Sequence, residues 1–538
     1  MNRIFLRRTF FLPRHRSPLF WPKIGVFVIT FTSFGLYHAS RKNLSGVKAS
    51  VANDWLNGTT YHGVNATTPL FTNISDANKF LGLLDALFMS FYAAALFFWG
   101  YLGDVMNPRN VVAFGMITSA ISLGLFSLVP YYLNFYDIPW YIVMWAFFGV
   151  AQACGWPNNV AIMGNWFGKD RNNKNSSTGF ILGIWSANQS VGNIFGSIMV
   201  SIIIKFGYMY TFICNVVLLL FGALLVQYGI QPSPKDYQNL DEEPEIESQL
   251  DVTQSLPSIN SSVNVRVRSG SRHSSPSISS QDQISASETK QRISLWKALF
   301  LPGVLPYCLC NACLKLVNYA FFFWLPFYLN HNYGWNESIA NRLSVWYDIG
   351  GIFGSILGGL LTDKMGFRTP IIMVMLLMSI LCLIVFANLG ASYVLNMIGL
   401  FLLGSTISGP YNLIVGTISV DLGTQKALKG NKDAMSTVSG LIDGTGSAGS
   451  AIGQLLVPLV QEKFGWNRVF YMFVISNIFA IICLLQRFMD EMRKILNKST
   501  SRRRRGHRRT SSNDNVGDGS ATQPNETELP NEIDCLLS

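Results

Sequence analysis

Charged side chains are scarce in this sequence of 538 residues. Asp, Glu, Lys and Arg make up 13% of the chain, compared with roughly 25% in an ordinary soluble domain, whereas apolar residues make up 49%. At roughly 20 residues per membrane crossing, this apolar content provides about a dozen transmembrane helices and leaves little for a water-soluble core. The composition argues against a soluble globular enzyme and indicates a polytopic membrane protein.

The chain also lacks the motifs of enzymatic chemistry. It contains no Walker motif, metal-ligand cluster or convincing nucleophile triad, so we expect no catalysis, cofactor or metal. Seven of the eight cysteines lie in apolar segments and Cys535 lies in the polar C-terminal segment, so no disulfide framework is implied. Cys310 and Cys313 have redox or metal spacing, but within one membrane-length helix this favours helix packing.

Apolar runs bounded by charged or turn residues predict twelve transmembrane helices in two sets of six. The first set lies near residues 24–45, 80–102, 111–130, 140–165, 179–203 and 209–230. The second set lies near residues 303–329, 343–362, 369–388, 392–416, 436–460 and 468–488. The expected fold is an all-α membrane protein with six-helix bundles over residues 24–230 and 303–488. The first run is too long and too charged for a cleaved signal peptide.

Three polar segments flank these bundles. Residues 1–23 are basic, residues 231–295 are Ser-rich, and residues 489–538 contain a run of arginines and then a Ser/Asn/Glu stretch. The last two have too little apolar content to offset the entropy of ordering them, so we expect a disordered linker and a disordered tail. The net charge of +11 is concentrated at the two ends, which predicts cytosolic termini rather than a nucleic-acid partner.

Glycosylation sequons agree with this topology. Asn57, Asn65 and Asn73 lie in the loop after the first span. With a cytosolic N-terminus this loop is lumenal or extracellular, where such sites can be used.

An internal repeat supports the division into two halves. GYLGD, ending at Asp104, is followed by Arg109 after the second span, and GLLTD, ending at Asp363, is followed by Arg368 after the eighth, with identical spacings. We interpret these four charged residues as a cytosolic gate, because each carboxylate can face a helix N-terminus while each arginine offers a releasable partner. Glycines of the fifth and eleventh spans also match in spacing: Gly183, Gly192 and Gly196 with Gly440, Gly449 and Gly453.

Cationic side chains inside spans are costly and therefore indicate a polar cavity. Arg41 and Lys42 lie in the first span and Lys315 lies in the seventh, which are corresponding positions in the two halves. Their charges would converge on a central cavity and favour a dianion, with Arg41 gripping a phosphate through two parallel hydrogen bonds. Alternatively, Arg41 and Lys42 extend to the lumenal interface. His38, one turn before Lys42, could bond the substrate or a neighbouring helix.

Three carboxylates also lie inside predicted spans: Asp85, Asp348 and Asp443. Each could pair with a cation of the empty protein or organise helix contacts. Asp443 precedes Gly444 and Gly446 in a glycine-rich stretch, which indicates a hinge or a close helix crossing.

Several segments together resemble one protein family. They are YHASRK with Arg41, GWPNNVAIMGNWFGK, SVGNIFGS, CLKLVNYAFFFWLPFYL, WYDIGGIFG, SVDLGT and DGTGSAGSAIGQ. They are similar to the sugar-phosphate exchanger family, the glucose-6-phosphate transporter-like group of the major facilitator superfamily, whose loop signature the paired G-x-x-x-D…R motif resembles. FFFWLPFYL and WYDIGG are most similar to the branch called sugar phosphate exchanger 3. The resemblance covers about residues 20–490 and implies antiport of a sugar phosphate and inorganic phosphate across an endomembrane.

The resemblance also implies roles for single residues. Arg41 occupies the family's phosphate-binding arginine position. Bacterial relatives have a second arginine where this chain has Asn318, so Lys315, one turn earlier on a similar face, would take its part. Those relatives carry a histidine in the fifth span where this chain has the string WSANQS. Asn188 in this string can still form hydrogen bonds. We expect these residues, together with Lys42 and His38, to bind the substrate.

Two other functions stay open from the sequence. The protein could carry another organic anion, such as a different phosphate ester or a phosphonate, or it could be a membrane sensor or scaffold without transport. The C-terminal Glu532, Leu536 and Leu537 fit an acidic dileucine sorting signal for endosomes or lysosomes, whereas other family members reside in the endoplasmic reticulum. The expected partners are a sugar phosphate, inorganic phosphate and the lipid bilayer; an accessory subunit is left open.

Overall fold

The computed structural model describes residues 19–57, 69–167, 181, 184–234, 236–237, 295–423 and 434–513. No β-strand occurs within these ranges. Most of the predicted linker, the sequon Asn65 and the predicted sorting residues Glu532, Leu536 and Leu537 lie outside the described residues. Residues from Gln486 onward form a unit separate from the rest of the chain, and the architecture below concerns the residues before it.

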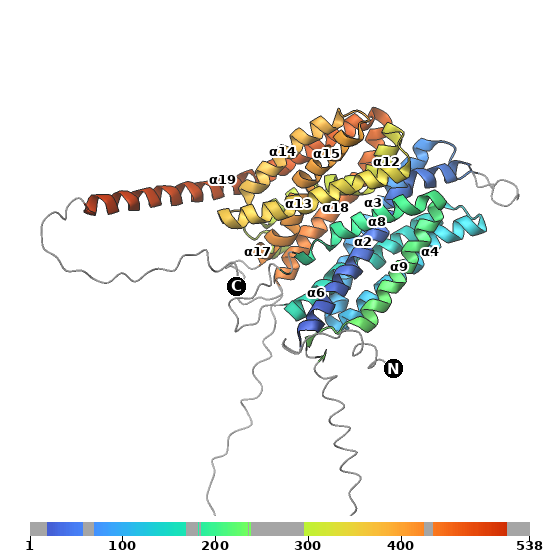
Figure 1. The fold of residues 1–538 in the computed structure, drawn as a ribbon, viewed down its shortest axis with the longest axis horizontal. Coiled ribbons are helices and arrows are strands. Elements are labelled where there is room, and N and C mark those ends of the chain that lie inside the picture. The colour runs from blue at the N-terminus through green and yellow to red at the C-terminus, as the bar shows by residue number, and fades with distance from the viewer. Residues whose placement is uncertain are drawn as a thin grey trace, which may run out of the picture. The chain divides into compact units, whose positions relative to one another are not determined.

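The N-terminal half is an all-helical bundle (Figure 1). Its helices are α2 (Phe20–Asn57), α3 (Ile74–Val105), α4 (Pro108–Leu133), α5 (Ile138–Gln152), α6 (Gly155–Phe167), α8 (Asn188–Ile203), the 3₁₀ turn η1 (Ile204–Phe206) and α9 (Tyr208–Gly229). Asn73, Asn107 and Asp137 precede α3, α4 and α5, and each side chain accepts a hydrogen bond from a backbone N–H of the first turn. These N–H groups have no acceptor within the helix, so the caps fix where the helices begin.

The C-terminal half repeats this plan. Its elements are α11 (Leu295–Leu299), α12 (Val304–Tyr333), α13 (Glu337–Met365), α14 (Thr369–Ala387), α15 (Tyr393–Leu403), η2 (Gly404–Ser408), α16 (Gly409–Leu413), η3 (Ile414–Ile418), α17 (Ser419–Gly423), α18 (Ala434–Phe464) and α19 (Trp466–Asn513). The π-helical turns η2 and η3 interrupt the segment from Tyr393 to Gly423, which is long and apolar enough to cross a membrane as one piece.

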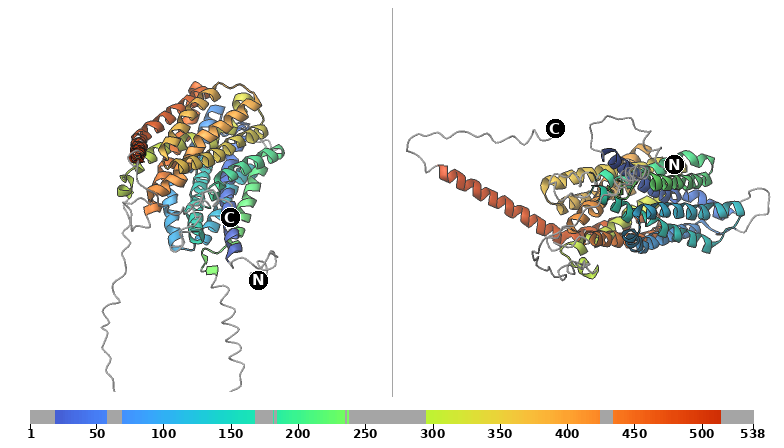
Figure 2. Two further views of the ribbon diagram at one scale, coloured as in Figure 1. Left: turned by 60° about the vertical axis from the view of Figure 1, so that its left-hand side comes forward. Right: turned by 90° about the horizontal axis from the view of Figure 1, so that it is seen from below.

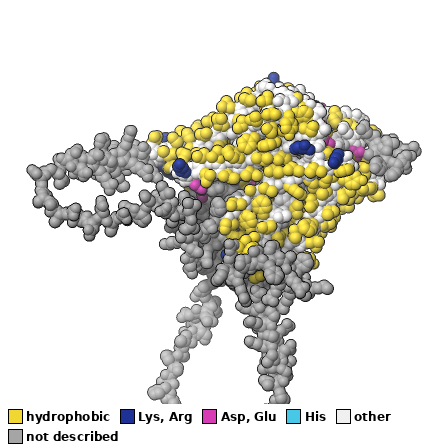
Figure 3. All heavy atoms as spheres, in the orientation of Figure 1, with side chains coloured by type: hydrophobic (Ala, Val, Ile, Leu, Met, Phe, Trp, Pro, Cys, Tyr) yellow, Lys and Arg dark blue, Asp and Glu magenta, His cyan; other side chains and the backbone are white. Residues whose placement is uncertain are grey.

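Within the described residues, eleven helices are long and apolar enough to span a membrane. Each falls at one of the twelve predicted spans, and α18 occupies the remaining one with a sequence rich in glycine and serine. The large apolar side chains that point away from the two bundles cover the surface seen in Figure 3. A lipid environment suits such a surface, so the chain is an integral, multi-pass membrane protein.

Two helices extend beyond their predicted ends. α2 continues past residue 45 to Asn57, because Val47, Val51 and Trp55 prolong its buried apolar face at a spacing of four residues. α19 runs to Asn513, past residue 489 where the sequence predicts the tail to begin. Apolar residues at helical spacing in the segment RFMDEMRKIL account for part of this extension.

The two halves lie side by side (Figures 1 and 2). The main helix pairs that join them are α2 with α12, α3 with α18, and α8 with α13, and α2 also contacts α13. In each pair one helix comes from each half, so α2, α3, α8, α12, α13 and α18 form the interface between the halves.

The glycine repeat corresponds to a structural repeat within the halves. A Cβ on Gly192 of α8 would lie 2.8 Å from the Cα of Gly35 in α2, and a Cβ on Gly449 of α18 would lie 2.8 Å from the Cα of Ala312 in α12. Real side chains do not tolerate such distances, so each glycine permits close backbone contact. The two halves therefore share a closely packed helix pair at corresponding positions, α2 with α8 and α12 with α18.

Candidate functional site

A proline in α12 frees a backbone carbonyl that faces the other half. Pro326 has no N–H with which to bond the carbonyl of Phe322 one turn earlier. That carbonyl instead accepts hydrogen bonds from Lys42 Nζ (2.6 Å) and Ser45 Oγ (2.7 Å) of α2. The C-terminal half thus supplies an acceptor for a buried cation of the N-terminal half.

Arg41, only 2% exposed, is held by neutral groups. Its Nε donates to Gln152 Oε1 at 2.7 Å, and its Nη1 lies 3.4 Å from His38 Nε2. The guanidinium carbon lies 4.6 Å from the centroid of the Tyr92 ring. Among the described residues, no carboxylate forms an ion pair with Arg41. A buried charge without a counter-ion is costly, so this guanidinium is suited to an anionic ligand.

Lys315 of α12 has a carboxylate partner. Its Nζ lies 2.7 Å from Asp443 Oδ1 and 2.8 Å from Ser447 Oγ, both on α18. The close crossing of these helices at Gly446, where a Cβ would lie 2.9 Å from Lys315 Cδ, permits this contact. The His38 ring centroid lies 6.4 Å from that of Phe322, and the Phe322 centroid lies 5.6 Å from that of Tyr319, whose ring lies 5.2 Å from Lys315 Nζ. We call Arg41, His38, Lys315 and Asp443 the cation cluster.

A chain of hydrogen bonds links His38 of α2 to α13 of the C-terminal half. His38 Nδ1 lies 3.1 Å from Asn193 Oδ1 on α8, and Asn193 Nδ2 donates to Asp348 Oδ1 on α13 at 2.9 Å. Because Asn193 Oδ1 can only accept, His38 carries its proton on Nδ1, and Nε2 is then the acceptor for Arg41. His38 therefore contacts a neighbouring helix, one of its two predicted roles.

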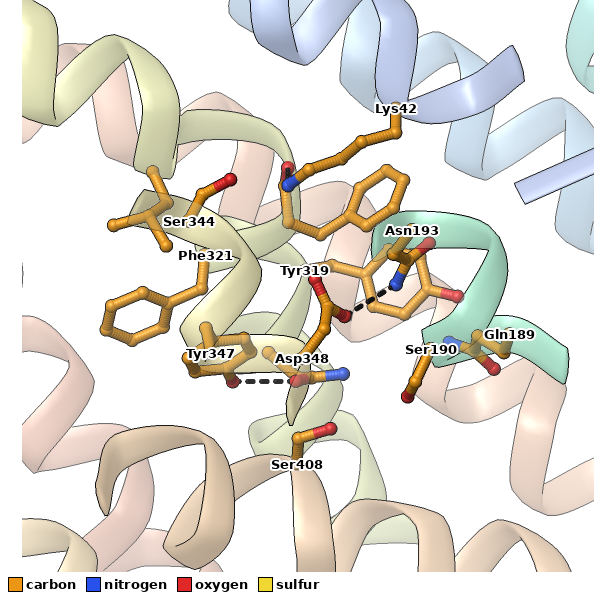
Figure 4. A pocket seen from close by; sticks show the side chains of 13 residues that line it. Lys42, Gln189, Ser190, Asn193, Tyr319, Phe321, Ser344, Tyr347, Asp348 and Ser408 are labelled. Carbon is orange, nitrogen blue, oxygen red and sulfur yellow. Dashed lines mark hydrogen bonds between the residues drawn. The ribbon is translucent and has the colours of Figure 1, made fainter. Parts of the chain in front are cut away.

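A cavity lies between the halves next to this chain (Figure 4). We call this cavity the central pocket. Polar side chains from both halves line it: Lys42, Ser190, Asn193, Asn318, Tyr347, Asp348 and Ser408. Tyr347 donates its hydroxyl hydrogen to Asn318 Oδ1 at 2.7 Å. Tyr319 and Phe322 also line the cavity, and Lys315 Nζ lies 5.2 Å from the Tyr319 ring. These two aromatic residues therefore adjoin both the central pocket and the cation cluster.

Asn188 does not line this pocket, unlike the neighbouring Gln189 and Ser190. Its side chain is fully buried, and neither amide atom has a hydrogen-bond partner among the described residues. The structure thus brings Arg41, Lys42, Lys315, His38 and Asn318 to the interface between the halves and leaves Asn188 beside it.

Lys48 is a buried cation that lies beyond residue 45, the predicted end of the first span, and inside the longer helix α2. Lys48 forms an ion pair with Asp85 of α3, and both side chains are fully buried. Its Nζ lies 3.6 Å from the centroid of the Trp324 ring in α12. A continuing apolar periodicity through Val47 and Val51 is the signal that identifies the longer helix. Lys48 therefore lies where the two halves meet.

The halves are held together near the α2–α3 and α12–α13 connections. Glu337, the first residue of α13, accepts hydrogen bonds from the backbone N–H of Ser50 (3.0 Å) and from its hydroxyl. Asn341, one turn later, donates to the carbonyl of Gly46 at 2.7 Å. A side chain on Gly46 would collide with Asn341, so the glycine permits this contact.

Further contacts join the halves on the same side. Lys79 of α3 lies 2.9 Å from Glu462 of α18, which also bonds Ser75. Ser338 of α13 donates to the carbonyl of Ser201 of α8 at 2.6 Å. We call the contacts of Glu337, Asn341, Ser338 and Glu462 the loop-side seal.

The four predicted gate residues lie at the opposite ends of these helices. Arg109 donates to Gln231 Oε1 at 3.0 Å, and Arg368 lies 3.6 Å from Asp363 and also bonds Asp421. The side chain of Asp104 lies outside the described part of the chain. Among the described residues, these arginines contact only their own half, so the structure is sealed on one side by the loop-side seal.

Comparison with known proteins identifies the family. Residues 30–431 match the model of the Major Facilitator Superfamily. The chain is 40% identical over 488 residues to sugar phosphate exchanger 3 of Xenopus laevis, which covers 89% of this chain and 95% of that protein. It is 38% identical over 465 residues to sugar phosphate exchanger 3 of Homo sapiens, covering 85% of this chain and 91% of that protein. The chain therefore belongs to the major facilitator superfamily and, within it, to the sugar phosphate exchangers, which confirms the resemblance seen in the sequence.

A plant relative and a solved structure of lower identity match most of the chain as well. Putative glycerol-3-phosphate transporter 5 of Arabidopsis thaliana is 35% identical over 477 residues, covering 87% of this chain and 92% of that protein. A crystal structure of a D-xylose-proton symporter superposes with a TM-score of 0.59 at 11% identity and covers 86% of this chain and 96% of that chain. At that identity the superposition supports the fold alone, which is the predicted one.

Proposed function

We propose that this protein is a secondary active transporter that exchanges a sugar phosphate for inorganic phosphate. One observation carries the proposal: Arg41 is buried between the two halves and, among the described residues, forms no ion pair with a carboxylate. A bound anion would compensate this cation. The relatives named sugar phosphate exchanger 3, glucose-6-phosphate exchanger and putative glycerol-3-phosphate transporter support phosphate esters as the substrate class.

Exchange rather than one-way transport follows from the cost of moving the empty site. Closing the halves around Arg41 without an anion leaves its charge desolvated and unpaired, which raises the barrier to switching sides. Bound phosphate or sugar phosphate removes that barrier. The halves would then rock about the site without any covalent chemistry, the loop-side seal opening as the Asp104, Arg109, Asp363 and Arg368 gate closes.

The experiment is uptake into liposomes that contain the purified protein and are loaded with phosphate. We expect uptake of labelled phosphate and glucose 6-phosphate to require internal phosphate and to fall at least a hundredfold in Arg41→Ala. The matched control is Arg342→Ala, because Arg342 is exposed on α13. Phosphate self-exchange without glucose 6-phosphate uptake would favour another organic anion. The absence of any flux from folded protein would contradict the proposal and favour a sensor or scaffold.

We further propose that both termini are cytosolic and that the protein resides in the endoplasmic reticulum or in endosomes and lysosomes. The basic N-terminal segment supports the orientation. Asn57 ends α2 and Asn73 caps α3, so both sequons lie on the side of the loop-side seal. A mobility shift on glycosidase treatment that is lost in the Asn→Gln variants of these sites would support this orientation, and a modified cytosolic tail would contradict it.

A further inference from the structure

We infer that the central pocket is the subsite for the hydroxyl groups of the organic phosphate, and that it separates polyhydroxylated phosphate esters from inorganic phosphate and from simple alkyl phosphates. This inference rests on the proposed function and deepens it, because it assigns the non-phosphate part of the substrate to named residues. The observation behind it is the chemistry of the cavity wall, which differs from that of the adjacent cation cluster.

The central pocket contains hydrogen-bonding groups that the protein itself leaves free. Among the described residues, Asp348 Oδ1 accepts from Asn193, but Oδ2 has no hydrogen-bond donor. Asn318 Oδ1 accepts from Tyr347, whereas Asn318 Nδ2 has no acceptor among those same residues. The hydroxyls of Ser190 and Ser408 also face the cavity. Buried polar groups usually find partners, so this set is prepared for a ligand that both donates and accepts hydrogen bonds.

The charges of the central pocket and of the cation cluster indicate where each end of such a ligand binds. The central pocket holds one carboxylate, Asp348, and one cation, Lys42, whereas the cation cluster holds two cations, Arg41 and Lys315, and one carboxylate, Asp443. The net positive charge of the cation cluster favours the phosphate, and the Asp348 carboxylate accepts strong hydrogen bonds from hydroxyl groups. The phosphate therefore belongs at Arg41 and Lys315, and the hydroxyls belong at Asp348 and Asn318.

The spacing of Lys315 and Asn318 along α12 allows one ligand to reach both the cation cluster and the central pocket. Lys315 and Asn318 are three residues apart, which places them on the same side of the helix with a rise of roughly 4.5 Å. A hexose phosphate is long enough to hold its phosphate beside Lys315 and its ring hydroxyls beside Asn318. Inorganic phosphate would reach the cation cluster alone.

The test compares three substrates in phosphate-loaded liposomes: inorganic phosphate, glucose 6-phosphate and n-butyl phosphate, which has the ester group and no hydroxyls. In the wild-type protein we expect glucose 6-phosphate to be preferred over n-butyl phosphate. Asp348→Asn should reduce the ratio of glucose 6-phosphate to phosphate uptake about tenfold or more, since a hydrogen bond to a charged group is worth about that factor. Asn318→Leu should reduce the ratio by up to about tenfold, since hydrogen bonds to a neutral amide are weaker. Tyr347→Phe should reduce it about threefold, because Tyr347 positions Asn318.

The matched control is Tyr328→Phe, which removes a hydrogen-bonded hydroxyl of the same half outside the central pocket and should leave the ratio unchanged. Where a variant transports too slowly, its thermal stabilisation by each of the three compounds reports binding instead. A substrate ratio that stays constant in all pocket variants while phosphate exchange persists would overturn the inference alone. Loss of phosphate exchange in the wild-type protein would overturn the proposed function.

Discussion

The loop-side seal contains two glutamates whose surroundings predict unequal contributions. Glu337 is half-buried and accepts two hydrogen bonds from Ser50, whereas Glu462 pairs with Lys79 where both side chains are more than one-third exposed. Hydrogen bonds to a charged, half-buried group are worth about 1.5–3 kcal/mol, whereas solvent screens an exposed ion pair and leaves it little energy. Glu337→Ala should therefore shift the equilibrium toward the state open on this side by roughly 10- to 150-fold, and Glu462→Ala should shift it much less.

The assay is the rate at which a membrane-impermeant maleimide labels Ser201→Cys, a buried position beside the seal, from the side of the α2–α3 loop. When opening is fast, this rate is proportional to the fraction of molecules open on that side. The chain without the Ser201 substitution gives the background from the native cysteines. Equal labelling in the two glutamate variants, or faster labelling in Glu462→Ala, would refute the reasoning that burial determines the strength of the seal.

Two further predictions concern stability. Asp85→Asn should lower the unfolding free energy by about 3–5 kcal/mol, because it leaves Lys48 buried and unpaired. The double variant Lys48→Met with Asp85→Leu should lower the unfolding free energy much less. Equal thermal stability of the single and the double variant would contradict the buried ion pair. Gly449→Ala should cost about 1–3 kcal/mol through overpacking against Ala312, whereas Gly440→Ala, with open space around its Cβ position, should be neutral or stabilising. A thermal-unfolding comparison checks both pairs, and matching melting temperatures for the two glycine variants would show that α18 can move away from α12.

The sequence was sufficient to predict the helices and the division into two halves. Long apolar runs and a repeated motif are properties of the chain itself, so their positions follow without knowledge of three-dimensional contacts. Arg41, Lys42 and Lys315 were predicted for the same reason, since a charge inside an apolar run is visible in the sequence.

The partners of these cations could not be predicted. Gln152 and Asn193 are neutral amides, and nothing in their local sequence distinguishes a side chain that bonds Arg41 or His38 from one that bonds its own helix. The pairing of Asp85 with Lys48 depends on where α2 ends, which the sequence placed twelve residues too early. Partner choice thus depends on the rotation and register of helices that are distant in the chain.

The close glycine contacts also limit the size of what the protein can enclose. Gly192 joins α2 to α8, so Arg41 and Asn193 move together, and Gly449 joins α12 to α18, so Lys315 and Asp443 move together. In the proposed exchange, a ligand held at both Arg41 and Lys315 would bridge these two closely packed helix pairs. An anion too long for the gap would keep the pairs apart, and one too short would contact a single pair. The gap between the two helix pairs would then select ligands by length, independent of the chemical groups that line it.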